Sequence, residues 1–271
     1  MDNHPIGVFD SGLGGLTCVR ELECRMPHES VIYFGDTGRV PYGGRSREII
    51  TKYARQDVAF LRTHDLKAIV IACGTVSSTA IDELKAEQDI PVFGVVEPTA
   101  LKAVESTGNG KIGLIATRAT IATGAYEKIM LERDPDLEVH AAACPLFVPL
   151  VENGRTQPGD VVIETVVKDY LTPLKEAGID TLVLGCTHYP LIREVIQNFM
   201  GPEVTLVDSG AEVAHQVERY LTGQDQLSGL KERGHCQWFV SDSQQGFRDL
   251  ACCFLGRPVV ERVGRVDIEK Y

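Results

Sequence analysis

A short apolar run ends on a cysteine and a threonine in Ala68-Ile69-Val70-Ile71-Ala72-Cys73-Gly74-Thr75. A similar run, Thr181-Leu182-Val183-Leu184-Gly185-Cys186-Thr187-His188, has its cysteine 113 residues further along the chain. Short, nearly continuous apolar runs are typical of strands that are covered on both faces, as in a parallel sheet. The two stretches therefore predict two buried strands, each followed directly by a cysteine.

Other parts of the chain continue this pattern of strands and helices. Similar apolar runs predict further strands over residues 6–9, 31–34, 92–95, 111–116, 137–141, 204–207 and 237–240. Amphipathic stretches between them predict helices, for example over residues 46–62, 77–87, 119–133, 159–177 and 211–220. Strands that alternate with helices are typical of parallel sheets with helices on both faces. We therefore expect an α/β protein with doubly wound parallel sheets.

The order of these elements repeats. Residues 6–11 resemble residues 112–117 at an offset of 106, and residues 92–95 resemble residues 204–207 at an offset of 112. Together with the cysteine-bearing pair, these matches indicate two pseudo-symmetric domains with the active site in the cleft between them, although buried strands also resemble one another by composition alone. The tail has too few strands for a domain of its own. We expect residues 1–97 plus 209–271 to form the first domain and residues 98–208 the second.

Length and composition exclude several classes of protein. A chain of 271 residues with 44% hydrophobic and 24% charged residues is typical of a globular protein, not of a disordered or fibrous one. No apolar run approaches the ~18 residues of a membrane span, and the amino-terminal residues do not resemble a signal peptide. Without such a run we expect no membrane partner. The net charge of −11 repels phosphate backbones, so we expect no nucleic-acid partner either.

The eight cysteines are scattered and include no Cys-x-x-Cys motif. This usage favours a reducing cytoplasm over a disulfide framework, and it offers no zinc ribbon or thioredoxin motif. The Cys186-Thr187-His188 segment is a poor metal signal because it lacks further ligands at suitable spacing. We therefore expect no metal site, and most of the thiols to be small buried side chains.

Ligands of open parallel sheets bind beyond the carboxyl ends of the strands. There Cys73 and Cys186 occupy matching places before predicted helices, whose amino ends favour thiolates. Two thiols on opposite walls of a cleft suit proton transfer at carbon, because one can remove a proton from one face while the other delivers a proton to the opposite face. The alternative is that either cysteine is only a buried structural residue.

Other polar residues near these strand ends are candidates for supporting roles. His188 follows Cys186 by two residues and could tune its proton or bind the substrate. Asp10 and Glu152 could each support a thiol, or could merely cap a turn or a helix.

The segment Gly12-Leu13-Gly14-Gly15-Leu16-Thr17 supports a different interpretation. It follows a predicted strand and opens a helix, and Asp36 lies at about the distance expected of a ribose-binding carboxylate. However, Thr17 stands where a dinucleotide-binding motif has its third glycine, and this interpretation leaves the cysteine pair unexplained. Pyridoxal phosphate would need a suitably placed lysine, and no lysine lies at a predicted strand end.

Several motifs together resemble those of the glutamate racemases, within the cofactor-independent, two-cysteine aspartate/glutamate racemase family. The resemblance runs from about residue 6 to residue 210 and rests on Phe9-Asp10-Ser11-Gly12-Leu13-Gly14-Gly15-Leu16, Pro41-Tyr42-Gly43, Cys73-x-Thr75 and Gly185-Cys186-Thr187-His188-Tyr189-Pro190-Leu191. It implies an enzyme that interconverts L- and D-glutamate without a cofactor and supplies D-glutamate for peptidoglycan synthesis, and hence for cell shape. It also implies a cytoplasmic homodimer.

The resemblance assigns a role to each motif residue. Cys73 and Cys186 would be the acid/base thiols, Asp10 would support Cys73, and Glu152 and His188 would support Cys186. Substrate binding would fall to Asp10, Ser11, Pro41, Tyr42, Gly43, Gly74, Thr75, Thr187 and His188. The glycine-rich segment would then be a tight turn that presents Asp10 and Ser11.

One residue departs from the family's pattern. Gly74 stands where the family usually has asparagine, so a side-chain amide is missing beside Cys73. Losing one hydrogen bond to a charged ligand typically costs about 1.5–3 kcal/mol. We expect a competent but modified glutamate racemase, with two alternatives: a racemase of aspartate or a related acid, and a catalytically silent protein that only binds a ligand.

Overall fold

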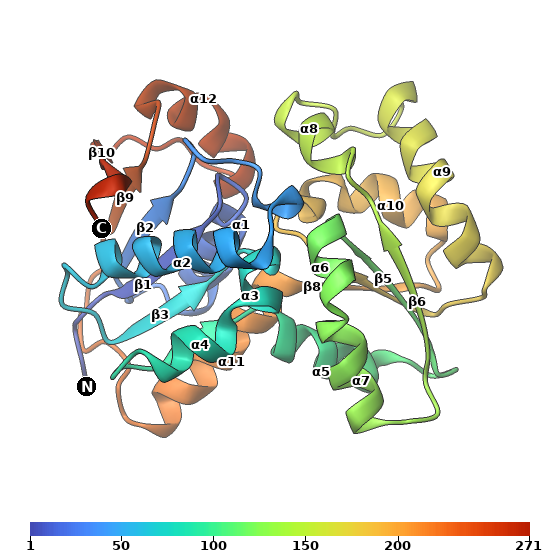
Figure 1. Cartoon of the computed structure of the whole chain (residues 1–271), viewed down its shortest axis with the longest axis horizontal. Coiled ribbons are helices and arrows are strands. Elements are labelled where there is room, and N and C mark those ends of the chain that lie inside the picture. Colours follow the sequence, from blue (N-terminus) through green and yellow to red (C-terminus); the bar gives the residue numbers. More distant parts are fainter.

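The computed structural model describes residues 1–271 and contains two parallel β-sheets (Figure 1). The first sheet has six strands in the order β10-β9-β2-β1-β3-β4. The second has four strands in the order β6-β5-β7-β8. The strands are β1 (Ile6–Asp10), β2 (Val31–Gly35), β3 (Ala68–Ile71), β4 (Val92–Gly94), β5 (Lys111–Ala116), β6 (Glu138–Ala143), β7 (Thr181–Leu184), β8 (Thr205–Asp208), β9 (Cys236–Val240) and β10 (Val263–Arg265).

The predicted α/β class with two parallel-sheet domains is confirmed. All neighbouring strands pair in parallel, and the order β2-β1-β3-β4 recurs as β6-β5-β7-β8. The three sequence matches therefore fall on equivalent strands, namely β1 with β5, β3 with β7 and β4 with β8. Strands β9 and β10 of the tail extend the first sheet beyond β2. The domain boundaries at residues 97/98 and 208/209 stay a prediction.

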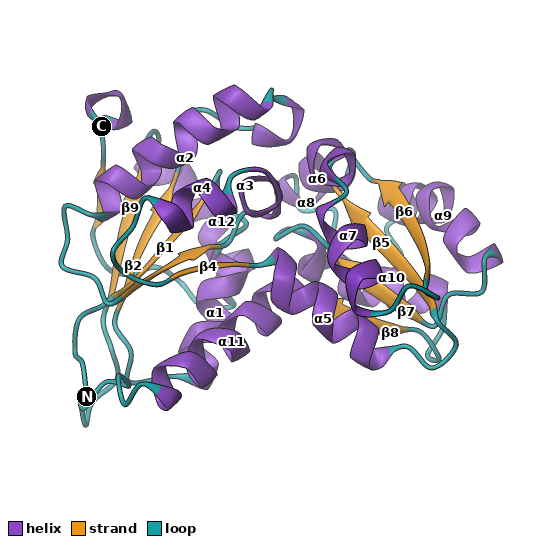
Figure 2. Cartoon of the chain, turned by 60° about the horizontal axis from the view of Figure 1, so that its bottom comes forward, coloured by secondary structure: helices purple, strands orange, loops and turns teal.

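Helices cover the faces of both sheets (Figure 2). Two of the predicted helices are broken in the structure: residues 77–87 by Ala80, and residues 119–133 by Gly124, which has a φ of 62°. The helices are α1 (Leu16–Arg25), α2 (Arg47–Leu61), α3 (Gly74–Thr79), α4 (Ile81–Ala86), α5 (Val96–Ser106), α6 (Arg118–Thr123), α7 (Ala125–Arg133), α8 (Phe147–Glu152), α9 (Val161–Glu176), α10 (Arg193–Met200), α11 (Ser209–Gly223) and α12 (Gln244–Leu255), with 3₁₀ turns η1 (Tyr42–Gly44), η2 (Tyr189–Ile192) and η3 (Ile268–Lys270).

The chain passes between the two sheets twice, through α5 and α11, which lie side by side between the two halves (Figure 2). The second passage begins at Asp208, whose carboxylate accepts hydrogen bonds from the first amides of α11 and so caps that helix. No helix is long and apolar enough to cross a membrane.

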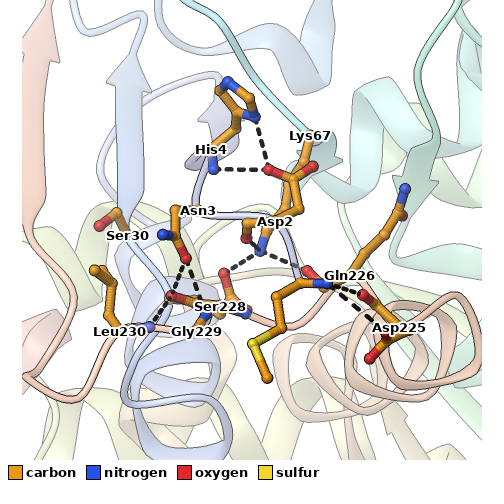
Figure 3. A network of polar contacts seen from close by, with 12 residues as sticks. Asp2, Asn3, His4, Ser30, Lys67, Asp225, Gln226, Ser228, Gly229 and Leu230 are labelled. Carbon is orange, nitrogen blue, oxygen red and sulfur yellow. Dashed lines mark hydrogen bonds and ion pairs between the residues drawn. The ribbon is translucent and has the colours of Figure 1, made fainter.

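A buried ion pair ties the returning tail to the start of the chain. Lys67 Nζ lies 2.5 Å from Glu29 Oε2, and both side chains are almost fully buried. The same ammonium donates to the carbonyls of Asp2 and Gln226, at 2.7 and 2.9 Å. Figure 3 shows the amino-terminal residues beside the loop from Asp225 to Leu230. This network lies at the amino ends of the strands, so it leaves their carboxyl ends free for a site.

Candidate active site

A cleft of about 450 Å³ lies where β1 and β3 of the first sheet face β5 and β7 of the second. In each sheet the strand order reverses at this central pair, because the following strands are added on opposite sides of it. Open parallel sheets bind ligands at such a point of reversal. The cleft is lined by Ser11, Gly12, Val40, Pro41, Tyr42, Gly43, Gly44, Cys73, Gly74, Thr75, Thr117, Arg118, Pro145, Val148, Pro149, Glu152, Gly185, Cys186, Thr187 and His188. Every residue predicted from the sequence for the site lines it except Asp10.

Cys73 lies on the wall that the first sheet contributes. It is the second residue after β3 and directly precedes α3. Its thiol donates a hydrogen bond to Ser11 Oγ at 3.3 Å. Burial, followed by the nearby Asp10 carboxylate, raises the pKa of Cys73 to about 12. The amino end of α3 was expected to lower this pKa, but burial outweighs that effect and favours the protonated thiol of Cys73.

Cys186 occupies the matching place on the wall of the second sheet, two residues after β7. His188 Nδ1 lies 4.0 Å from its sulfur, and His188 Nε2 lies 3.0 Å from Glu152 Oε1 at the end of α8. Burial disfavours a charged ring, but the contacts with Cys186 and Glu152 prevail and raise the pKa of His188 to about 10. A protonated His188 places a positive charge beside the Cys186 sulfur.

Asp10 lies behind the lining and is 1% exposed. Its Oδ2 accepts a hydrogen bond from the Gly12 amide at 3.0 Å, while its Oδ1 has no partner. Burial raises the pKa of this carboxyl. Ser11, rather than Asp10, is the hydrogen-bond partner of Cys73, and the predicted supporting role of Asp10 stays a prediction.

The glycine-rich turn packs against the second wall. A Cβ at Gly14 would overlap the Thr187 hydroxyl and the His188 ring, and Thr17 Oγ1 donates to the Thr187 carbonyl at 3.0 Å. The surface that would receive a phosphate in a dinucleotide-binding motif is thus filled by the protein's own second domain. The turn therefore packs against residues 186–188 and holds them in place.

Two further contacts join the walls beside Cys73. Thr75 Oγ1 lies 3.1 Å from Thr117 Oγ1, which caps α6 on the second domain. A Cβ built on Gly74 would lie 2.7 Å from the Gly185 carbonyl oxygen. The absence of a side chain at Gly74 therefore allows the two walls to approach closely. The sequence alone did not reveal this role.

The sequence interpretation missed part of the lining. Thr117 had a usable signal, because the offset of 106 pairs it with Ser11. Arg118 makes no ion pair with any carboxylate of the protein, and it brings a cation to the cleft. The apolar residues that precede and form α8, Pro145, Val148 and Pro149, carried no motif.

Two α/β domains with a thiol on each wall of one cleft form the arrangement that the sequence resemblance to the racemases predicts. The chain belongs to the Asp/Glu/hydantoin racemase family, whose pattern matches residues 17–217. This confirms the resemblance found in the sequence.

Individual relatives agree over nearly the whole length. A glutamate racemase of Geobacter metallireducens is 47% identical over 251 residues, which cover 93% of this chain and 92% of that protein. The crystal structure of a glutamate racemase from Bacillus anthracis matches with a TM-score of 0.93 at 38% identity, covering 98% of each chain. A glutamate racemase from Francisella tularensis, solved in complex with D-glutamate, matches with a TM-score of 0.91 at 36% identity over the full length of both chains.

Proposed function

We propose that this protein interconverts L- and D-glutamate by proton transfer at the α-carbon, with Cys73 and Cys186 as the two acid/base groups. The observation that carries the proposal is the placement of two thiols at equivalent positions after β3 and β7, on opposite walls of one cleft. The identity of the relatives and the D-glutamate complex of the Francisella enzyme support glutamate as the substrate.

The raised pKa of Cys73 on one wall and the protonated His188 on the other suit one direction of the reaction. Cys186, beside a protonated His188, acts as the base and takes the α-proton from one face of the substrate. Cys73, a protonated thiol, donates its proton to the opposite face, and the centre is inverted. The proton taken from the substrate then resides on Cys186, and Cys73 is left as the thiolate. The enzyme in this state is set to process the other enantiomer.

The lining offers groups for both ends of a dicarboxylic amino acid. The hydroxyls of Ser11, Thr75 and Thr187, with backbone amides at Gly43 and Gly74, are suited to the α-carboxylate and the ammonium group. Arg118 is suited to the second carboxylate, for which a guanidinium is a strong hydrogen-bond partner. The substrate's ammonium also brings positive charge into the cleft, which lowers the cost of forming a thiolate at Cys73.

The wider role is proposed from the family. D-glutamate made by this enzyme would enter peptidoglycan synthesis in the cytoplasm, and two copies of the chain would form a homodimer. Sedimentation of the purified protein tests the dimer directly.

Circular dichroism of L-glutamate and, separately, D-glutamate in deuterated buffer tests the function. Both enantiomers should decay to a racemate and gain deuterium at the α-carbon, as followed by NMR. Cys73→Ala and Cys186→Ala should each abolish racemisation, while Cys252→Ala, which changes an exposed thiol, should leave it intact. Turnover of aspartate alone would refute the substrate assignment, and glutamate binding without deuterium exchange would favour a silent binding protein.

A further inference from the structure

A buried group of charged side chains lies behind the first wall of the cleft. This carboxylate cluster consists of Asp36, Arg39, Tyr42 and Asp57. Arg39 Nε lies 2.6 Å from Asp36 Oδ2, and Arg39 Nη2 lies 3.1 Å from Asp57 Oδ1. The Tyr42 hydroxyl contacts Asp36 Oδ2 and also lies 3.1 Å from Asp57 Oδ2. Both aspartate side chains are 0% exposed, so the cluster is shielded from water.

The number of protons in the cluster follows from its contacts. One guanidinium faces two carboxyl groups, so two ionised aspartates would leave a buried charge without a partner, which is costly. The Tyr42 hydroxyl has a single proton, which it can donate to only one carboxylate. Arg39 lies closer to Asp36, at 2.6 Å, than to Asp57, at 3.1 Å, so Asp36 is the better placed counter-charge and the proton falls to Asp57. Asp57 then donates to the Tyr42 oxygen, and Tyr42 donates to the Asp36 carboxylate. Burial and the nearby Asp36 raise the pKa of Asp57 well above its usual range, in agreement with this arrangement.

The cluster anchors a segment that forms part of the cleft. Residues 40–44, here called the wall segment, all line the cleft, and Arg39 precedes them directly. Tyr42 belongs to the segment, and its buried hydroxyl reaches back to the cluster. At the tip, a Cβ on Gly43 would lie 3.0 Å from Thr117 Cβ, so the segment abuts the second domain. The wall segment therefore joins the carboxylate cluster to the second domain.

We propose that Asp36, Arg39 and Asp57 are positioning residues that hold the wall segment at its catalytic distance, with Asp36 as the charged carboxylate and Asp57 as the neutral one. The proposal rests on the proposed racemisation for its kinetic consequences. It assigns different tasks to two buried aspartates of the same cluster.

The difference between the two aspartates gives a sharp test. Asp57→Asn replaces a neutral acid with a neutral amide that keeps a donor for Tyr42 and an acceptor for Arg39, so KM and kcat should stay within about threefold of the wild type. Asp36→Asn removes the counter-charge of Arg39 and should raise KM for glutamate about tenfold, the size of one lost charge-assisted hydrogen bond. Tyr42→Phe should shift KM in the same direction. Glu269→Gln is the matched control, because this Arg39 partner is 63% exposed and its contact is weak.

Two measurements on the intact protein do not depend on turnover. At neutral pH the infrared spectrum should contain the carbonyl band of a neutral carboxylic acid that Asp57→Asn removes. Amide hydrogen exchange over residues 40–44 should be faster in Asp36→Asn than in the wild type and in Glu269→Gln. Equal KM increases in Asp36→Asn and Asp57→Asn, or no infrared band, would overturn the assignment of the proton to Asp57.

Unchanged exchange of the wall segment in Asp36→Asn and Tyr42→Phe would overturn the positioning role. If the wild type fails to racemise glutamate, the proposed function is wrong. The exchange and infrared results still decide whether the cluster positions the wall segment and whether Asp57 carries the proton.

Discussion

Replacing Gly74 with alanine should push the two walls of the cleft apart where Gly74 contacts Gly185. The Cβ of a Gly74→Ala variant would lie 2.7 Å from the Gly185 carbonyl oxygen, against about 3.4 Å for ordinary van der Waals contact. Both atoms are held by backbone next to Cys73 and Cys186, so neither can move by a side-chain rotation. The walls must therefore separate by roughly 0.7 Å, the difference between these two distances.

The expected loss follows from the geometry of proton transfer. Reaction between two fixed groups requires near-contact distances, and a misplacement of about 1 Å can cost about 100-fold in rate. Because the walls separate by less than this, we expect kcat for glutamate to fall between about tenfold and 100-fold. Local overpacking typically destabilises a protein by about 1–3 kcal/mol, so the variant should still fold.

Steady-state racemisation followed by circular dichroism in both directions measures this effect. Gly44→Ala is the matched control, since Gly44 also lines the cleft but a Cβ there meets nothing within 4 Å. Wild-type kcat in Gly74→Ala, or an equal loss in Gly44→Ala, would refute the reasoning. Gly74→Asn distinguishes the steric effect of the added Cβ from a contact with the substrate. If the asparagine amide binds glutamate, KM should be lower in Gly74→Asn than in Gly74→Ala.

Three further predictions concern pH, stability and thiol reactivity. The contacts that raise the pKa of His188 from 6.5 to about 10 stabilise the folded state fully below pH 6.5, and this stability is lost as the pH rises through about 10. The free energy of unfolding of the wild type minus that of His188→Asn should decrease over this range, and a flat difference would contradict it. Lys67→Met leaves Glu29 buried without its cation, so the free energy of unfolding in urea should fall by about 3–5 kcal/mol while kcat stays unchanged. A fall below about 1 kcal/mol would show that the ion pair is not buried as described. In the substrate-free protein at neutral pH, iodoacetamide should label the exposed Cys24 long before Cys73, because Cys73 is buried and its pKa is raised. Peptide mass spectrometry measures both labelling rates, and equal rates would count against the raised pKa of Cys73.

Hydrophobic periodicity was sufficient for the architecture. Buried parallel strands need continuous apolar runs, and nine of these were visible in the sequence with ends within two residues of the strands in the structure. Strand β10 and helix α12 were not predicted. β10 has only three residues, Val263–Arg265, and is recognisable as a strand only through its pairing with β9.

The cleft was partly readable for the same reason. Parallel strands bring their carboxyl ends to one edge, so residues within two positions of the ends of β1, β3 and β7 had to meet there, and Ser11, Cys73 and Cys186 do. Pro145 and Val148 could not be foreseen, because their place in the cleft depends on how α8 packs, not on a strand end.

The sequence by itself determined the class of fold, the repeated order of strands and the positions of both thiols, because these depend on local periodicity and on the direction of the strands. The tertiary structure alone decided how deeply each thiol is buried and how closely the two walls approach. Burial and the nearby Asp10 raise the pKa of the Cys73 thiol, while His188 lies between Cys186 and Glu152 and contacts both. Burial and close approach depend on how segments distant in the sequence pack together, as Gly74 packs against Gly185, and no pattern of neighbouring residues encodes them.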